Sequence, residues 1–210
     1  MSYDYYDAER DAALDDFYQQ VREELYPEHK AQAIQEFTAD RLKSFYVDKP
    51  KVMGPAVRAY GEAKKLHSLE HYAPAVVFSV TAIEVFLKTT LLKPVVFGLV
   101  HHESLAAVIV EHTFGQTGFE RYKTLLSSLF SSIAEIDLNS VKREAAGSSL
   151  LDEVLSLQKL RNKIIHQGLQ CVKEDADNAL AICSAVYGMI VLPMLNALGL
   201  KVEKGVINVV

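Results

Sequence analysis

Residues 148–168 read SSLLDEVLSLQKLRNKIIHQG and carry the signals of one complete α-helix. Ser148 and Ser149 offer an N-cap, and Asp152 and Glu153 follow in the first turn, where the helix dipole favours acidic side chains. Leucine, valine and isoleucine recur at intervals of three and four residues, which is the period of an amphipathic helix. Gly168 is placed to end the helix, because glycine readily adopts the left-handed conformation of a C-cap.

Outward from this stretch, the rest of the chain is composed for helices. The 210 residues include only 10 Gly and 6 Pro, which leaves little turn chemistry for a sheet-rich fold. Half of the residues are hydrophobic and about a quarter are charged, as in a globular protein and unlike a disordered chain. We therefore expect an all-α bundle of about seven or eight helices. They are predicted at about residues 8–26, after Pro27, and at about 56–69, 72–92, 103–113, 119–136, 150–166 and 175–198.

The amino-terminal part differs from the remainder in charge. The chain has a net charge of −5, of which residues 1–28 carry −7 and the remaining residues +2. We expect residues 1–54 to form an acidic N-terminal helical extension, residues 55–200 the helical bundle and residues 201–210 a weakly alternating tail. The acidic first helix either docks on a basic face of this protein or of a partner, or is solvated; the sequence leaves both open.

The cysteine content and the apolar segments bear on the cellular compartment. Cys171 and Cys183 form no CxxC pair and are too few for a zinc site or a disulfide framework. Residues 178–200 contain no charged side chain, yet polar, Gly and Pro residues interrupt them and no aromatic anchor flanks them. A fully buried core helix has the same composition. We expect a cytoplasmic protein with no membrane partner.

Polar, titratable residues interrupt the apolar pattern of the quoted helix near its carboxyl end. Asn162 and His166 are four residues apart and share a face. Arg161 projects roughly 140° around the axis from His166, although a long guanidinium can still reach the same groove. An Arg beside a His can hold a phosphate while the His moves a proton. The spacing alone also fits an exposed Arg and a His that caps helix carbonyls.

Glu84 is an acid inside an apolar run that includes Val80 and Ile83. Burial of an unpaired carboxylate is costly, so Glu84 needs a partner. Arg161 would relieve the cost and would itself be oriented by the contact. A surface pair between Glu84 and Lys88, four residues apart, is the alternative.

The run Arg161-Asn162-Lys163-Ile164-Ile165-His166 resembles the hallmark of the HEPN family, the higher eukaryotes and prokaryotes nucleotide-binding domains. In that hallmark an Arg, often followed by a polar residue, precedes a His by a few positions. The placement is also similar, because the motif ends one helix and a long apolar helix closes the domain. Residues 79–88, with Glu84 among them, resemble the second conserved helix of the family. The resemblance covers roughly residues 55–200 and implies a HEPN-like helical bundle.

Catalytic HEPN domains are metal-independent endoribonucleases that act as dimers, so the resemblance implies a composite active site at a homodimer interface. His166 would move the proton of the ribose 2′-OH or of the leaving 5′-oxygen, and Arg161 would stabilise charge on the phosphate. Asn162 would orient the His or the phosphate, and Glu84 would support the site. The products would carry 2′,3′-cyclic phosphates, and no metal or other cofactor is expected. Lys159 and Lys163 flank the motif as candidate RNA-binding residues, although each also reads as a solvated lysine.

The implied partners are an RNA substrate, a second copy of the chain and an antitoxin or regulatory protein, as in a toxin or an antiviral, phage-defence effector. Toxins of the family that pair with a nucleotidyltransferase antitoxin often carry a Tyr two residues after the His, and Gly168 stands there in this chain. That departure puts this particular pairing in doubt. The alternative function is a non-catalytic HEPN-like helical interaction module of a defence or regulatory complex.

Overall fold

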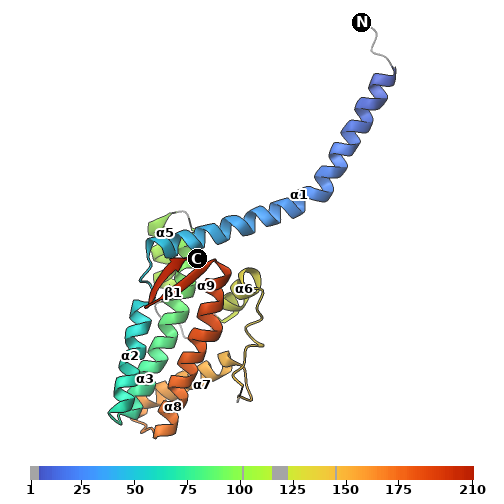
Figure 1. Cartoon of the computed structure of the whole chain (residues 1–210). Helices are drawn as coiled ribbons and strands as arrows, with labels where there is room; N and C mark the ends of the chain where they lie inside the picture. The colour runs from blue at the N-terminus through green and yellow to red at the C-terminus, as the bar shows by residue number, and fades with distance from the viewer. Residues whose placement is uncertain (1–4, 101, 115–122, 145) are drawn as a thin grey trace. The chain divides into compact units, whose positions relative to one another are not determined.

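The chain divides into two compact units in the computed structural model, which describes residues 5–100, 102–114, 123–144 and 146–210 (Figure 1). The first unit comprises residues 1–39 and the second residues 40–210. Helix α1 (Tyr5–Asp48) begins in the first unit and ends in the second.

Helix α1 is continuous through Pro27, so the break that the sequence analysis placed there is wrong. The fixed φ of proline is itself helical, and a proline inside a helix removes one hydrogen bond without ending the helix in every case. The side chains described within the first unit include several exposed apolar residues: Leu14, Phe17, Tyr18 and Phe37.

The second unit begins at Asp40, earlier than the expected boundary after residue 54. The last turns of α1 belong to it because Leu42, Phe45 and Tyr46 are buried there. Gly98 permits the close approach of this helix end, since a Cβ at Gly98 would lie 3.2 Å from Leu42 Cδ2. Arg41 Nε also donates a hydrogen bond to the Gly98 carbonyl at 3.2 Å.

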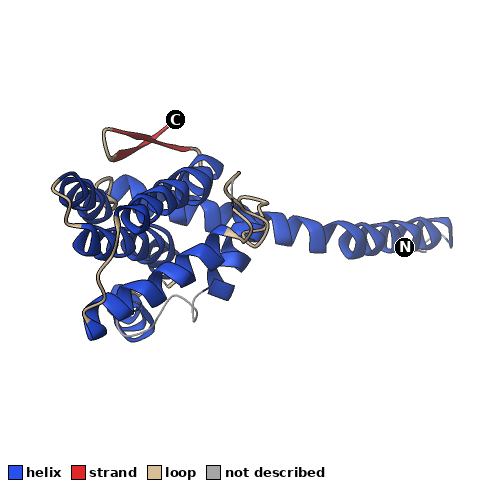
Figure 2. Cartoon of the chain, turned by 90° about the horizontal axis from the view of Figure 1, so that it is seen from below, coloured by secondary structure: helices blue, strands red, loops and turns tan. Residues whose placement is uncertain are grey.

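The second unit is a helical bundle, which confirms the all-α class expected from the sequence (Figure 2). Its central helix is α3 (Tyr72–Val85), which packs against α2 (Gly54–Ser68), α7 (Leu150–Gln167) and α8 (Lys173–Val186). A helix with neighbours on three sides is apolar around most of its circumference, as the sequence of α3 is. The remaining helices are α4 (Lys93–Leu99), α5 (Glu103–Phe114), α6 (Lys123–Ile133) and α9 (Leu192–Ala197).

Two π-helical segments interrupt the long apolar helices, and each is followed by a proline. Segment η1 (Phe86–Leu92) lies between α3 and α4, and η3 (Tyr187–Val191) lies between α8 and α9. Pro94 and Pro193 occupy the second positions of the helices that follow. A proline has no N–H and crowds the carbonyl four residues before it, and a wider π turn relieves that crowding. The helix that the sequence analysis ended at about residue 92 therefore continues through a π turn into α4.

The chain ends in an antiparallel hairpin of β1 (Leu200–Glu203) and β2 (Val206–Val209). Lys204 and Gly205 form its two-residue turn, both with positive φ, as the twist of a tight hairpin favours. Leu200 and Ile207 are buried, and Ile207 N donates to the Pro50 carbonyl at 2.9 Å. The segment that the sequence analysis separated as a tail is therefore packed on the bundle.

The two longest apolar stretches of helix, Tyr72–Gly98 and Lys173–Ala197, are long and apolar enough to cross a membrane by length and composition. Within their most apolar windows, 61% and 44% of the residues are buried inside the protein. Both stretches pack in the bundle core, and core helices satisfy the same criterion.

Candidate active site at the end of helix α7

Helix α7 begins and ends at the residues that its sequence predicts. Ser149 is the N-cap, and its Oγ accepts a hydrogen bond from Asp152 N at 3.2 Å. Gly168 is the C-cap in the left-handed conformation, with φ of 66°. These two caps fix where the helix stops and therefore which turns carry the Arg-x4-His motif.

The motif occupies the last two turns of α7. Arg161 Nη1 donates to the Asn162 Oδ1 at 3.2 Å, so the two neighbouring side chains are linked. His166 is exposed and lies one turn beyond Asn162 on the same face. The structure thus places an oriented guanidinium and an accessible imidazole on one helix end.

Arg161 combines partial burial with an unneutralised charge. It is half-buried, and its Nε has no hydrogen-bond partner among the described residues. No carboxylate of the described part of the chain lies within ion-pair distance of it. A buried, unpartnered donor on a cation is costly in a resting protein, so the arrangement favours an anion that arrives from outside.

Glu84 faces α7 but contacts a residue that the sequence analysis did not name. Its Oε1 accepts a hydrogen bond from Gln158 Nε2 at 2.7 Å, and Glu84 is half-buried. Gln158 precedes Arg161 by three residues, so the contact holds the α7 turn next to the motif. The partner that relieves burial of Glu84 is thus Gln158 and not Arg161. The pair is separated by 74 positions, and no local pattern signals it.

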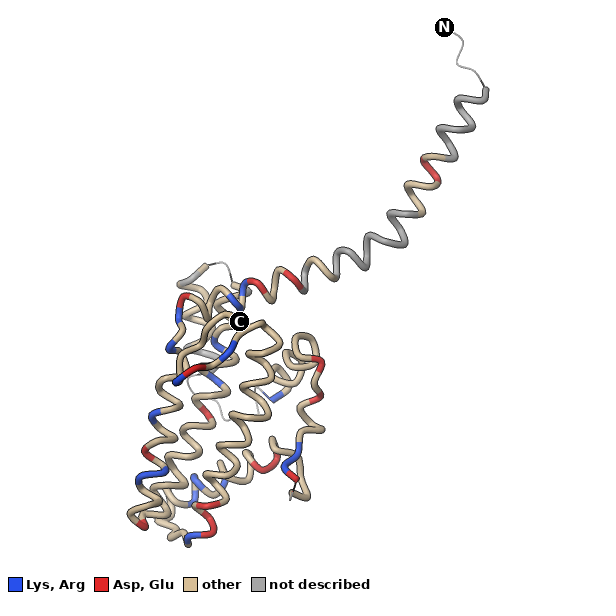
Figure 3. The backbone as a smooth tube through the Cα atoms, in the orientation of Figure 1, with Lys and Arg blue, Asp and Glu red and all other residues tan. Residues whose placement is uncertain are grey.

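Lys159 and Lys163 are both exposed and are four residues apart on α7. Figure 3 shows acidic and basic positions intermixed along the coloured part of the chain, with no single basic stripe. An RNA contact through these lysines would therefore be confined to the neighbourhood of the motif.

An apolar hollow of about 500 Å³ lies beside the motif, between the start of α3 and the end of α7. Its lining includes Val77 on α3 and Ile164 on α7, and the loop residues Gly168 and Leu169 close one side. Two large apolar side chains of its lining are exposed: Phe78 and Leu169. The sequence analysis did not identify this surface, because its lining comes from two helices that lie far apart in the sequence.

An ion pair braces the other end of α7. Arg143 donates to both carboxylate oxygens of Glu153, and its Nη2 also donates to Asn178 Oδ1 at 2.9 Å. The hydrogen bond to Glu153 raises the pKa of Arg143 further above its ordinary value. The loop before α7, the first turns of α7 and α8 are joined through one guanidinium.

Within the part of the chain that the structure describes, no three His, Cys, Asp or Glu side chains gather into a group that could hold a metal ion. His102 is exposed, and its Nδ1 lies 2.9 Å from Ser104 Oγ.

The comparisons with known proteins found no match for this chain. No protein-family model matches it, and no curated protein or solved structure is similar enough to count as a match.

Proposed function

We propose that this protein is a metal-independent endoribonuclease of the HEPN type, which acts as a homodimer with a composite active site. The observation that carries the proposal is the state of Arg161. It is oriented by Asn162, has no carboxylate partner among the described residues and lies five positions before the exposed His166. A guanidinium in that state suits a phosphate, which it binds through paired N–H donors.

The chemistry needs one proton-transfer group and one anion-stabilising group. His166 takes the proton of the ribose 2′-OH, the 2′-oxygen attacks the phosphorus, and the bond from phosphorus to the 5′-oxygen breaks. The leaving 5′-oxygen takes a proton from the His166 of the second copy, and the product is a 2′,3′-cyclic phosphate. Arg161 stabilises the charge that builds on the phosphate oxygens. Lys159 and Lys163 bind the RNA backbone next to Arg161. The protein acts as a cytoplasmic toxin or defence effector.

The apolar surface beside the motif supports the dimer. Phe78 and Leu169 are 38% and 41% exposed, and both line the hollow next to Gly168. Exposed apolar side chains that cluster on one face are typical of protein–protein interfaces. A second copy seated there would bring two motifs together around a shared site.

The decisive experiment compares RNA cleavage by the wild type, His166→Ala and His102→Ala in the presence of EDTA, with the ends of the products identified. We expect cyclic-phosphate ends from the wild type and from His102→Ala, and a loss of about 10²- to 10⁴-fold in His166→Ala. Cleavage that survives in His166→Ala removes His166 from the chemistry. A folded, dimeric wild type that cleaves no RNA would instead support the interaction module.

The dimer is tested separately by light scattering after size-exclusion chromatography. Leu169→Asp introduces a charge into the exposed apolar surface, and Val108→Asp introduces the same charge at a valine that is 50% exposed on α5. We expect Leu169→Asp to be monomeric and inactive and Val108→Asp to resemble the wild type. A dimer that withstands Leu169→Asp places the interface elsewhere.

A further inference from the structure

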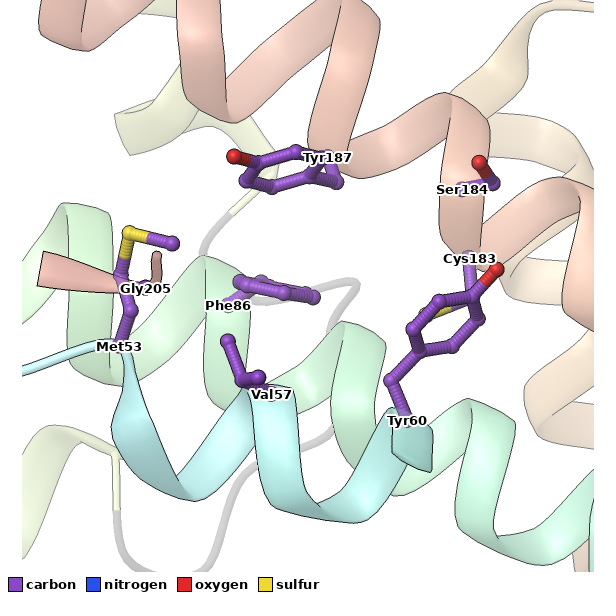
Figure 4. A pocket seen from close by; sticks show the side chains of 8 residues that line it. All are labelled: Met53, Val57, Tyr60, Phe86, Cys183, Ser184, Tyr187 and Gly205. Carbon is purple, nitrogen blue, oxygen red and sulfur yellow. The ribbon is translucent and has the colours of Figure 1, made fainter. Parts of the chain in front are cut away.

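A second pocket lies among α2, the two π-helical segments and the turn of the carboxyl-terminal hairpin (Figure 4). Its volume is about 230 Å³. Met53, Phe86 and Cys183 form a buried floor, with 1–3% of each residue exposed. Val57 and Ser184 are exposed and mark the mouth. Protein interiors seldom leave voids much larger than a water molecule, so a hollow of this size with a buried floor calls for an explanation.

Both π-helical segments begin at this pocket. Phe86 is the first residue of η1, and Tyr187 is the first residue of η3. Their rings lie 5.6 Å apart between centroids and are inclined by 35°. A π turn widens the helix and redirects the side chains at its start, and such turns are frequent at functional sites. Here two of them turn an aromatic ring toward the same hollow (Figure 4).

The lining selects against charged ligands. The residues that surround the hollow are Met53, Val57, Tyr60, Phe86, Cys183, Ser184, Tyr187 and Gly205, and none of them carries a charge in its neutral-pH form. Burial raises the pKa of the Cys183 thiol to about 12, although Lys64 opposes part of this rise, so the thiol is protonated at neutral pH. A nucleotide or phosphate would lose its hydration against these neutral walls, and the nearby Lys64, whose Nζ lies 4.6 Å from the centroid of the Tyr60 ring, is not among the lining residues. The pocket is thus unsuited to the RNA substrate of the proposed ribonuclease.

The size and the chemistry of the walls favour a small aromatic ring system. An apolar cavity of roughly 150 Å³ accommodates benzene, and pockets for drug-sized ligands begin at roughly 300 Å³. The present volume lies between the two and fits one or two fused rings. Tyr60, Phe86 and Tyr187 offer aromatic edges and faces, and the thioether of Met53 makes favourable contacts with ring edges. A few hydroxyl groups at the walls supply hydrogen bonds that fix orientation.

We propose that this pocket binds a neutral, planar aromatic molecule of one or two fused rings, separately from RNA at the motif. The ligand stacks against the Phe86 and Tyr187 pair and enters past Val57. Binding needs no metal, no second copy and no RNA, so its test is independent of the ribonuclease proposal.

Indole serves as the probe, because it is neutral, planar and bicyclic. Titration calorimetry on the full-length protein is expected to show saturable binding of one indole per chain, and methyl NMR spectra are expected to show a shift of the Met53 methyl group. Octanol, an aliphatic probe with a similar number of heavy atoms, is expected to bind at least tenfold more weakly. Equal or tighter binding of octanol would overturn the assignment to aromatic ligands.

The variant Val57→Trp fills the mouth with a ring of the protein's own, and we expect it to weaken indole binding at least tenfold. Val57 is 41% exposed, so the larger side chain can be accommodated without disturbing the buried floor. Val108→Trp makes the same change at an exposed valine of α5 and is expected to bind indole like the wild type. No saturable binding by the folded wild type, equal binding by Val57→Trp, or methyl shifts at Val77 in place of Met53 would each overturn the proposal.

Discussion

The two hollows of the bundle lie at different levels of the same helix and differ in kind. Near the start of α3, the groove beside Gly168 is wide, its apolar rim is exposed and the motif of α7 stands next to it. About two turns further on, where η1 follows α3, the pocket at Phe86 is smaller, has a buried floor and has no charged residue in its lining. Under the two proposals made above, the first hollow would serve chemistry on an anion and the second would bury an apolar molecule, so the two activities would be separate.

The largest effect is expected from Arg161→Ala, which tests the proposed active site. Loss of the guanidinium leaves the phosphate charge without a preorganised cation, so we expect RNA cleavage to fall by about 10²- to 10³-fold. Stability should change little, since Arg161 has no ion-pair partner among the described residues and its side chain is hydrogen-bonded there to the adjacent Asn162. Lys163→Ala is the matched control, because it removes an exposed cation from the same turn and should cost less than tenfold. Equal losses in the two variants would mean that general positive charge, and not this guanidinium, matters.

Tyr46→Phe tests the buried surroundings of η1, the π-helical segment at the second pocket. Pro94 has no N–H to offer the Thr90 carbonyl, and the buried hydroxyl of Tyr46 donates to that carbonyl at 2.5 Å. Removal of the hydroxyl leaves a buried acceptor without this donor, so we expect the free energy of unfolding to fall by about 1–3 kcal/mol in urea denaturation. Tyr187→Phe, in the half-exposed segment before Pro193, is expected to change it by less than about 0.5 kcal/mol. A large loss in Tyr187→Phe would show that the hydroxyl of Tyr187 stabilises η3 as much as the hydroxyl of Tyr46 stabilises η1.

A feature of the fold can be predicted from the sequence when the interactions that determine it are local. The caps of α7 were predictable, because Ser149 and Gly168 act on backbone groups within a few residues of themselves. The interruption at Pro94 was also predictable, but its form was not. The carbonyl of Thr90, four residues before Pro94, accepts a hydrogen bond from the distant Tyr46, and the sequence around Pro94 does not reveal that contact. Pro27 shows the converse, because a local breaker signal does not end a helix whose remaining hydrogen bonds persist.

The candidate site divides in the same way. Arg161, Asn162 and His166 were found from spacing on one helix, and the structure places them on the last two turns of that helix. The contact between Glu84 and Gln158 was not found, since it joins two helices whose packing no short motif encodes. The pocket at Phe86 was missed for a further reason. Its lining comes from α2, η1, α8 and η3 and from the turns at Met53 and Gly205, and most of it consists of residue types that normally fill cores.

Gln158→Ala probes the link between the two levels. Its amide donates to Glu84, which lies two residues before the Phe86 ring of the pocket. Loss of a hydrogen bond to a half-buried carboxylate is expected to lower the free energy of unfolding by about 1–2 kcal/mol. We also expect a smaller loss of cleavage than in Arg161→Ala, because the α7 turn next to the motif loses an anchor. Indole affinity that falls together with cleavage would indicate that the two levels are coupled instead of independent.

Gly168→Ala should affect only the end of α7 that carries the Arg-x4-His motif. Nothing lies within 4 Å of a Cβ placed there, so the cost arises only from forcing alanine into a φ of 66°. We expect a loss of about 1 kcal/mol in the free energy of unfolding, with indole binding unchanged. Gly147→Ala is the control, since its Cβ also meets nothing and its φ is not positive. A comparable loss in both variants would argue against the left-handed cap as the cause.

The smallest predicted effect is the change in stability that Asp152, at the start of α7, causes on acidification. Hydrogen bonding to Ser149, and then to Lys123, lowers the pKa of Asp152 in the folded protein below its ordinary value. A carboxyl group with a lowered folded-state pKa contributes stability that is complete above the unfolded value of about 3.9 and is lost as the pH falls through the folded value. Because the Asp152 side chain is 53% exposed, solvent screening limits the contribution to a few tenths of a kcal/mol. Asp152→Asn should therefore unfold slightly more easily than the wild type at pH 7 and equally easily near pH 2. A difference that persists at pH 2 would assign the effect to hydrogen-bond geometry, and a difference that grows on acidification would reverse the sign argued here.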